Sequence, residues 1–140
     1  MPSMDDVKRM VQGDQYARQS GIELLSVAPG RAAAKMPIRP IHLNGLGMVQ
    51  GGAIFTLADF AFAAASNSRG QIAVAINVSI TFMKSVNSGT LTAEARELSY
   101  NPKLGAYTID ITDERHNLIA VFQGLAYRKK DPVPPIAPPV

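Results

Sequence analysis

The 140-residue sequence contains no cysteine. This absence excludes disulfides, metal sites built on thiolates and cysteine nucleophiles. A reducing cytoplasm is consistent with it, and the cytoplasm is where we expect the protein. Residues 1–6 also lack the apolar core of a secretory signal peptide, so we do not expect secretion.

A strong charge of either sign is lacking too. Charged residues make up 18% of the chain, hydrophobic residues make up 46%, and the net charge is +3, a composition typical of globular rather than disordered proteins. No basic stripe alternates with aromatic residues, so we do not expect nucleic-acid binding. We interpret the basic cluster Arg128-Lys129-Lys130 as a solvated strand end, with a phosphate contact as the alternative.

The length predicts a single domain at residues 1–130, and the proline-rich residues 131–140 predict an extended, mostly unstructured tail.

Helix and strand patterns appear in turn before residue 40. Residues 4–19 place apolar side chains at helical spacing, and Ser3 can cap that helix, with two aspartates in the first turn where the helix dipole favours them. Two strand-like runs follow, at residues 22–27 and 32–38. The dipeptide Pro29-Gly30 between them suits a tight turn. We therefore expect a short amphipathic helix followed by a strand pair.

Residues 51–68 are apolar on nearly every face of a helix. Such a helix lies inside a protein or inside a membrane. Crossing a bilayer takes about 20 apolar residues, and this run is shorter. We therefore expect a buried central helix and no membrane partner.

The residues after this helix alternate with the period of a strand. Residues 72–83 form the clearest such run, which is long and unbroken. Three more runs follow, at residues 90–98, 106–112 and 117–128. The connections are short and rich in turn residues, which favours an antiparallel meander. One apolar helix and about six strands predict an α+β fold in which a curved antiparallel sheet wraps the central helix.

Asp59 interrupts the apolar character of the central helix. Removing a carboxylate from water costs on the order of several kcal/mol, so a buried aspartate usually has a partner or a function. The alternatives are an exposed edge of the helix or a hydrogen bond to nearby backbone. Gly51 and Gly52 open the same helix, where bare N–H groups at the positive end of the dipole can polarise a carbonyl and hold an oxyanion. A flexible helix start is the alternative for this pair.

The spacing of these groups has a geometric consequence. Asp59 lies eight residues after Gly51, which is roughly 12 Å along the axis of a helix. That separation is too large for both groups of one helix to act on one carbonyl. If they act together, the carboxylate comes from a second subunit related by a two-fold axis, and the pairing forms two equivalent sites. Residues 72–83 are the edge at which we expect the two sheets to join.

Residues 44–59, with the sequence NGLGMVQGGAIFTLAD, resemble the active-site segment of PaaI-type hotdog thioesterases. Residues 61–68, 80–83 and 89–93 are similar to that family as well, and the likeness extends over residues 21–130. The resemblance implies a hotdog fold, in which an antiparallel sheet wraps a helix. It also implies homodimers that often pair into tetramers, and hydrolysis of acyl-coenzyme A without a metal or other cofactor.

The resemblance also implies roles for individual residues. Asp59 would be the catalytic carboxylate, acting as general base or as nucleophile. Gly51 would donate its N–H to the thioester oxygen, and Asn44 would orient water or substrate across the dimer. Gln50 stands where the family usually has histidine, and it can donate a hydrogen bond but cannot titrate near neutral pH. This departure leaves open a second function, a module that binds acyl-coenzyme A without cleaving it. A dehydratase is disfavoured, because no histidine occupies the helix start.

Four further residues are candidate substrate contacts. Gly52 belongs to the helix start, and His42 is close enough to Asn44 to line the mouth of a pocket. Phe55 is expected in the core, as are Phe60, Phe62 and Phe82, with contact to an acyl group as the alternative. Asn77 could face the dimer seam, and the alternative is simple solvent exposure.

The acyl group and the phosphate contacts of coenzyme A stay open at this stage. Aryl-acetyl, benzoyl and medium aliphatic groups all fit the pattern. The phosphates could contact cationic side chains at the ends of predicted elements, namely those of Arg69, Lys84, Arg128 and Lys129.

Overall fold

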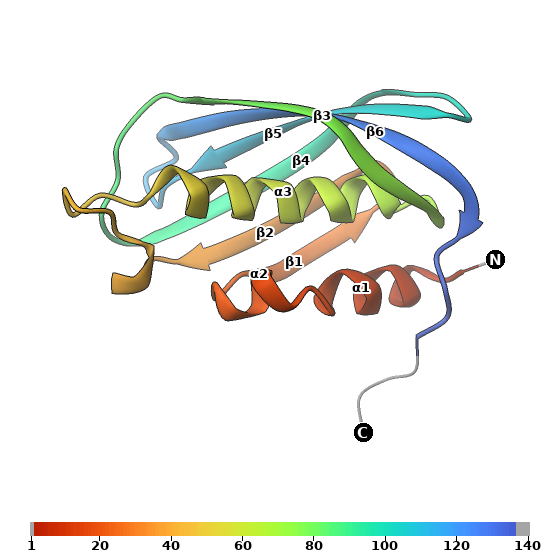
Figure 1. Ribbon diagram of the computed structural model, residues 1–140, viewed down its shortest axis with the longest axis horizontal. Helices are drawn as coiled ribbons and strands as arrows, with labels where there is room; N and C mark the ends of the chain where they lie inside the picture. The colour runs from red at the N-terminus through yellow and green to blue at the C-terminus, as the bar shows by residue number, and fades with distance from the viewer. Residues whose placement is uncertain (1, 137–140) are drawn as a thin grey trace.

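The computed structural model describes residues 2–136, in which a long helix lies against the concave face of one curved antiparallel sheet (Figure 1). The helices are α1 (Met4–Gln12), α2 (Gln15–Gln19) and α3 (Gly51–Asn67), with the short 3-10 helix η1 (Pro40–His42). The strands are β1 (Glu23–Ala28), β2 (Arg31–Pro37), β3 (Gln71–Phe82), β4 (Thr90–Tyr100), β5 (Leu104–Thr112) and β6 (Leu118–Pro132). This arrangement confirms the predicted α+β fold class.

The sheet order is β1-β2-β4-β5-β6-β3, so the predicted meander is correct only for β4 to β6. The reason lies in residues 84–89, which carry the chain across the end of the sheet. Their carbonyl groups accept hydrogen bonds from two other segments: Val86 from the N–H of Val49, at 2.8 Å, and Gly89 from the N–H of Ile38, at 2.9 Å. The chain therefore enters β4 beside β2, and β3 pairs with β6 instead. As a result, β1 and β3 are the two edges of the sheet.

The N-terminal segment forms two helices, whereas one helix was predicted. Ser3 caps α1 as expected, since its hydroxyl accepts from the N–H of Asp6 and the Asp6 carboxylate accepts from Ser3 in return. The chain then turns at Gly13, and Asp14 caps α2 by accepting a hydrogen bond from the N–H of Ala17 at 3.0 Å. The apolar spacing continues through this turn, so periodicity alone does not reveal the break.

The core lies between α3 and the sheet. Small residues allow a close approach: an added Cβ at Gly124 of β6 would lie 2.7 Å from the ring of Phe62. Phe62 packs edge-on against Tyr107 of β5, with ring centroids 5.7 Å apart. Phe60 and Phe62 are buried as predicted, but Phe82 is 50% exposed at the end of β3, so its assignment to the core was wrong. Within residues 2–136, no helix combines the length and apolar content needed to cross a bilayer.

The last strand continues further than predicted. β6 extends to Pro132, and the next residue, Val133, is buried and donates its N–H to the carbonyl of Gly70 at 2.8 Å. Arg9 of α1 then donates to the carbonyl of Ile136. The first part of the expected unstructured tail is therefore held against the domain, because an apolar side chain and backbone hydrogen bonds fix it. Residues 137–140 of that tail lie outside the described residues.

Candidate active site

The loop before α3 is organised by Asn44. Its side-chain Oδ1 accepts hydrogen bonds from the N–H groups of Leu46, at 2.9 Å, and Met48, at 3.1 Å. Its own backbone N–H donates to the carbonyl of Met48 at 2.7 Å. Within residues 2–136 the Nδ2 group has no acceptor, and Asn44 is exposed. The side chain therefore braces the loop through its oxygen and keeps its donor end available.

The start of α3 presents two free backbone donors. The carbonyl of Gln50 accepts from the N–H groups of Ala53 and Ile54, the first hydrogen bonds of the helix. The N–H groups of Gly51 and Gly52 have no acceptor in residues 2–136. Both lie at the positive end of the helix dipole, where an oxygen that carries negative charge is stabilised.

A Cβ added at either glycine would displace a neighbouring side chain. A Cβ added to Gly52 would lie 2.5 Å from Oε1 of Gln50, so the Gln50 side chain lies against Gly52 at the helix start. A Cβ added to Gly51 would lie 3.0 Å from the ring of Phe82. The Gln50 side chain makes no capping hydrogen bond. It is thus free to donate to a bound oxygen, although it cannot supply a proton.

His42 has a structural role in addition to its predicted place at the pocket. It is buried, and its Nδ1 accepts a hydrogen bond from the N–H of Arg39 at 2.9 Å. The ring proton is therefore on Nε2, which donates to the carbonyl of Ser20 at 2.7 Å. Both ring nitrogens are occupied by backbone partners, so His42 contributes its ring surface to the site.

A cavity of about 480 Å³ joins these parts, a volume within the range of small-molecule sites. It lies between η1 with the following loop, α2 and the first turns of α3. Its lining residues are Tyr16, Gln19, Ser20, Ile41, His42, Leu43, Asn44, Gly45, Gln50, Gly52, Ala53 and Thr56. The cavity thus brings together four of the predicted site residues, and along α3 it ends at Thr56.

Asp59 lies one turn beyond this cavity. Its side chain is half-buried and forms no hydrogen bond with residues 2–136, so the alternative of a backbone partner does not apply. Burial raises the pKa of Asp59 above the ordinary value, and the nearby negative charge of Asp14 raises this pKa further. A carboxylate with a raised pKa is a stronger base than an ordinary aspartate.

The structure does not bring Phe55 and Asn77 to this cavity. Phe55 is half-buried and packs edge-on against Phe122, with ring centroids 5.3 Å apart. Asn77 is exposed in β3 beside a β-bulge and borders a separate depression of about 260 Å³, together with Gln123 and Leu125 of β6. Within one subunit, neither residue lines the cavity that Asn44 borders.

Sequence reasoning missed the contribution of α2 and of Asp14. Tyr16 and Gln19 of α2 line the cavity, yet they lie more than 20 residues before the loop that they face. Their contact with that loop is tertiary, so no local pattern indicates it. The sequence Gly13-Asp14 was the available signal, because a glycine followed by a helix-capping residue is typical of a break between helices.

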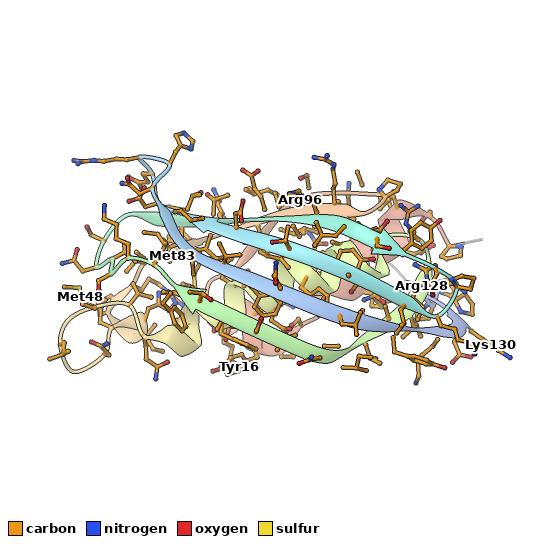
Figure 2. All side chains as sticks on the ribbon, turned by 90° about the horizontal axis from the view of Figure 1, so that it is seen from above. Tyr16, Met48, Met83, Arg96, Arg128 and Lys130 are labelled. Atoms are coloured by element: carbon orange, nitrogen blue, oxygen red, sulfur yellow. The ribbon has the colours of Figure 1, made fainter. Side chains whose placement is uncertain are left out.

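Two of the four predicted phosphate contacts, Arg69 and Arg128, are engaged elsewhere in the fold. Figure 2 shows Arg128 and Lys130 at the end of the sheet opposite Met48. Arg128 is only 7% exposed and hydrogen-bonds Gln71, so the prediction of a solvated strand end was wrong for this residue. Arg69 forms two hydrogen bonds with Glu97, at 2.8 and 3.2 Å, and stacks on the ring of Tyr100. Both arginines are therefore already engaged within the fold.

Comparisons with known proteins identify relatives of this chain. The family model of the thioesterase superfamily matches residues 46–120. The acyl-coenzyme A thioesterase PaaI of Escherichia coli is 37% identical over 120 residues, which cover 85% of this chain and 86% of that protein. Acyl-coenzyme A thioesterase 13 of Homo sapiens is 29% identical over 112 residues, which cover 77% of this chain and 80% of that protein.

The structural comparison agrees. A solved structure of the E. coli PaaI protein, from the phenylacetic acid degradation operon, superposes with a TM-score of 0.88 at 33% sequence identity. The superposition covers 93% of this chain and 95% of that one. The segment matched by the family model contains Gln50, Gly51 and Asp59.

Proposed function

The chain belongs to the thioesterase superfamily, has the hotdog fold and is a thioesterase; on that premise we propose that it hydrolyses acyl-coenzyme A to a free acid and coenzyme A. The observation that carries the proposal is the combination of two free N–H groups at the start of α3 with a half-buried carboxylate on the same helix. The relatives with acyl-coenzyme A thioesterase in their names support the choice of substrate.

The N–H groups of Gly51 and Gly52 supply the oxyanion site. When water or a carboxylate attacks the thioester carbonyl, negative charge develops on its oxygen. Donors that are already oriented stabilise this charge without reorganisation, and one such donor typically contributes about a hundredfold or more in rate. Asn44, with its free Nδ2 group, and Gln50 border the cavity that Gly52 also lines, and they orient the substrate or the water.

Asp59 supplies the carboxylate in its ionised form. As a general base it takes a proton from water while the water oxygen bonds to the carbonyl carbon. The carbon–sulfur bond then breaks, and the coenzyme A thiolate leaves and is protonated. As a nucleophile, Asp59 would form an anhydride with the acyl group, which water then hydrolyses. Gln50 cannot donate the proton that the thiolate needs, so this proton comes from Asp59 or from water.

The complete site requires two subunits in this proposal. The cavity ends at Thr56, and Asp59 is roughly 12 Å along the helix from Gly51. β3 is an edge strand with an unpaired side, and it exposes three large apolar residues, Val74, Ile76 and Phe82, with the exposed Met83 directly after it. Such an edge pairs readily with another strand. Two copies joined antiparallel along β3 would place Asp59 of each near the helix start of the other.

The test is the release of free thiol from a panel of aryl-acetyl, benzoyl and medium-chain acyl-coenzyme A thioesters. We expect the wild type to turn over at least one member of the panel, and we expect the rate to fall by about a hundredfold or more in Asp59→Asn.

The pKa of Asp59 is raised in the fold, so its ionised form destabilises the folded state at neutral pH. The Asn variant should therefore melt at the same or a higher temperature. Equal rates for the wild type and Asp59→Asn would contradict the catalytic role of Asp59. If the wild type bound the thioesters tightly without turnover, the function as a binding module would be favoured.

A further inference from the structure

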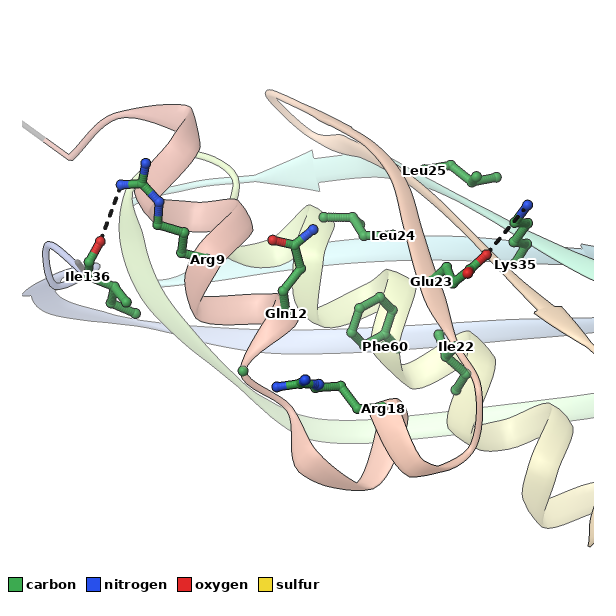
Figure 3. A pocket seen from close by; sticks show the side chains of 11 residues that line it. Arg9, Gln12, Arg18, Ile22, Glu23, Leu24, Leu25, Lys35, Phe60 and Ile136 are labelled. Atoms are coloured by element: carbon green, nitrogen blue, oxygen red, sulfur yellow. Dashed lines mark hydrogen bonds and ion pairs between the residues drawn. The ribbon is translucent and has the colours of Figure 1, made fainter. Parts of the chain in front are cut away.

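A second cavity, of about 760 Å³, lies outside the residues assigned to hydrolysis. It opens between the connection of α1 with α2 and the edge strand β1 (Figure 3). β3, the edge proposed to join two subunits, is the opposite edge of the sheet. The cavity therefore stays open in a dimer that is joined along β3.

The inner wall of this cavity is apolar. Phe60 of α3, which is 3% exposed, and Ile22, which is 6% exposed, border the cavity together with Leu24 and Ile136. In Figure 3 the Phe60 ring lies between Ile22 and Gln12. A cavity of this size with an aromatic inner wall suits the hydrocarbon part of a small molecule.

The rim carries more positive than negative charge. Lys35 pairs with Glu23 at 3.4 Å, and Arg9 lies 4.0 Å from Asp6 and donates to the carbonyl of Ile136. Arg18 is exposed at the same rim, and within residues 2–136 its guanidinium has no acceptor. The two pairs balance their charges, so Arg18 supplies the unbalanced positive charge.

We propose that this cavity is a binding site for a carboxylate with an apolar body, such as a medium-chain fatty acid, with the carboxylate at Arg18 and the hydrocarbon chain against Phe60. Charge complementarity selects an anion, and the planar guanidinium fits a carboxylate through two parallel hydrogen bonds. The apolar wall selects against small inorganic anions. The site does not depend on the proposed hydrolysis, because the two cavities share no residue.

The experiment titrates the isotope-labelled full chain with octanoate and follows the backbone amide signals by NMR. We expect saturable shifts at Gly13, at residues 22–25 and at Lys35. Arg18→Gln should weaken octanoate binding by about fivefold or more. The matched control Arg115→Gln removes the same charge from an exposed turn and should leave binding unchanged. The uncharged probe 1-octanol should bind more weakly than octanoate and should be insensitive to Arg18→Gln.

Three results would overturn the proposal. The first is equal octanoate affinity of the Arg18→Gln and Arg115→Gln variants. The second is a set of shifts concentrated at residues 50–56, which would make octanoate a ligand of the catalytic cavity instead. The third is shifts that never saturate. The readout is binding, so an inactive protein would not affect the conclusion.

Discussion

Gly51 occupies the first position of α3, where a proline is tolerated and where its N–H serves no helical hydrogen bond. Gln50 before it has φ −66° and ψ 139°, a conformation that a following proline accepts. Gly51→Pro therefore removes the proposed donor with little effect on the helix. We expect kcat for an acyl-coenzyme A substrate to fall by about a hundredfold or more.

Gly51→Ala is the matched control for that change. It adds the same Cβ, which must displace the exposed ring of Phe82, but it keeps the N–H. We expect this variant to retain most of the activity. If the Pro and Ala variants were equally slow, the loss would come from the displaced ring, and the N–H would have no catalytic role.

Asp14 offers a test of the ionisation of Asp59. Its negative charge contributes to the raised pKa of Asp59. Asp14→Asn keeps an oxygen that can cap α2 but removes the charge, so the pKa of Asp59 should fall. In the proposed mechanism the catalytic form of Asp59 is the ionised one, and it would then persist to lower pH. The acidic limb of the pH profile of kcat/KM should move to lower pH, whereas Asp110→Asn, an exposed change on β5, should leave it in place. An unmoved limb in Asp14→Asn would contradict the coupling.

The site residues differ in how far the sequence could predict them. Gly51 and Asp59 were identifiable as candidates, because a glycine pair at a helix start and a carboxylate in an apolar helix conflict with simple packing. The structural roles of Asn44 and His42 were not identifiable, because both side chains contact backbone amides and carbonyls, which are the same for every residue type. Asp14 reaches Asp59 only through the turn between α1 and α2, which apolar periodicity did not reveal.

At the scale of elements, α3 is held close to β6 by Gly124. The Cβ of an alanine at this position would lie 2.7 Å from the Phe62 ring, which itself is fixed by Tyr107. Gly124→Ala should therefore lower the free energy of unfolding by about 1–3 kcal/mol, measured by urea denaturation. Gly45→Ala is the control, because a Cβ there meets no atom within 4 Å, and its effect should stay within about 0.5 kcal/mol. Equal stability of both variants would show that the ring moves aside freely.

The positions of the helices and strands were predicted closely from the sequence, but the pairing of the strands was not. The continuous apolar run predicted α3, and strand-like runs predicted all six strands, because both kinds of pattern are local in the sequence. The pairing of β3 with β6 depends on the crossing of residues 84–89, which backbone hydrogen bonds from Val49 and Ile38 fix. Backbone partners are the same for every residue type, so the composition of this connection gave no indication of the crossing.

In the assembled protein, the proposed mechanism requires that subunits share their catalytic groups. Each site would combine Asp59 of one subunit with the helix start of the other, and two such sites would form per dimer. Asp59→Asn and Gly51→Pro would then damage different halves of each site. A dimer that contains one copy of each variant would keep one intact site, composed of Asp59 from the Gly51→Pro subunit and the helix start from the Asp59→Asn subunit.

The most direct measurement is therefore the activity of an equal mixture of these two inactive variants after subunit exchange, with mixed dimers verified by native mass spectrometry. Half of the dimers should be mixed, and each should have one working site of two, so we expect about a quarter of the wild-type rate. A mixture of verified mixed dimers that stays at the rate of its separate variants would contradict the account, because each site would then lie within a single subunit.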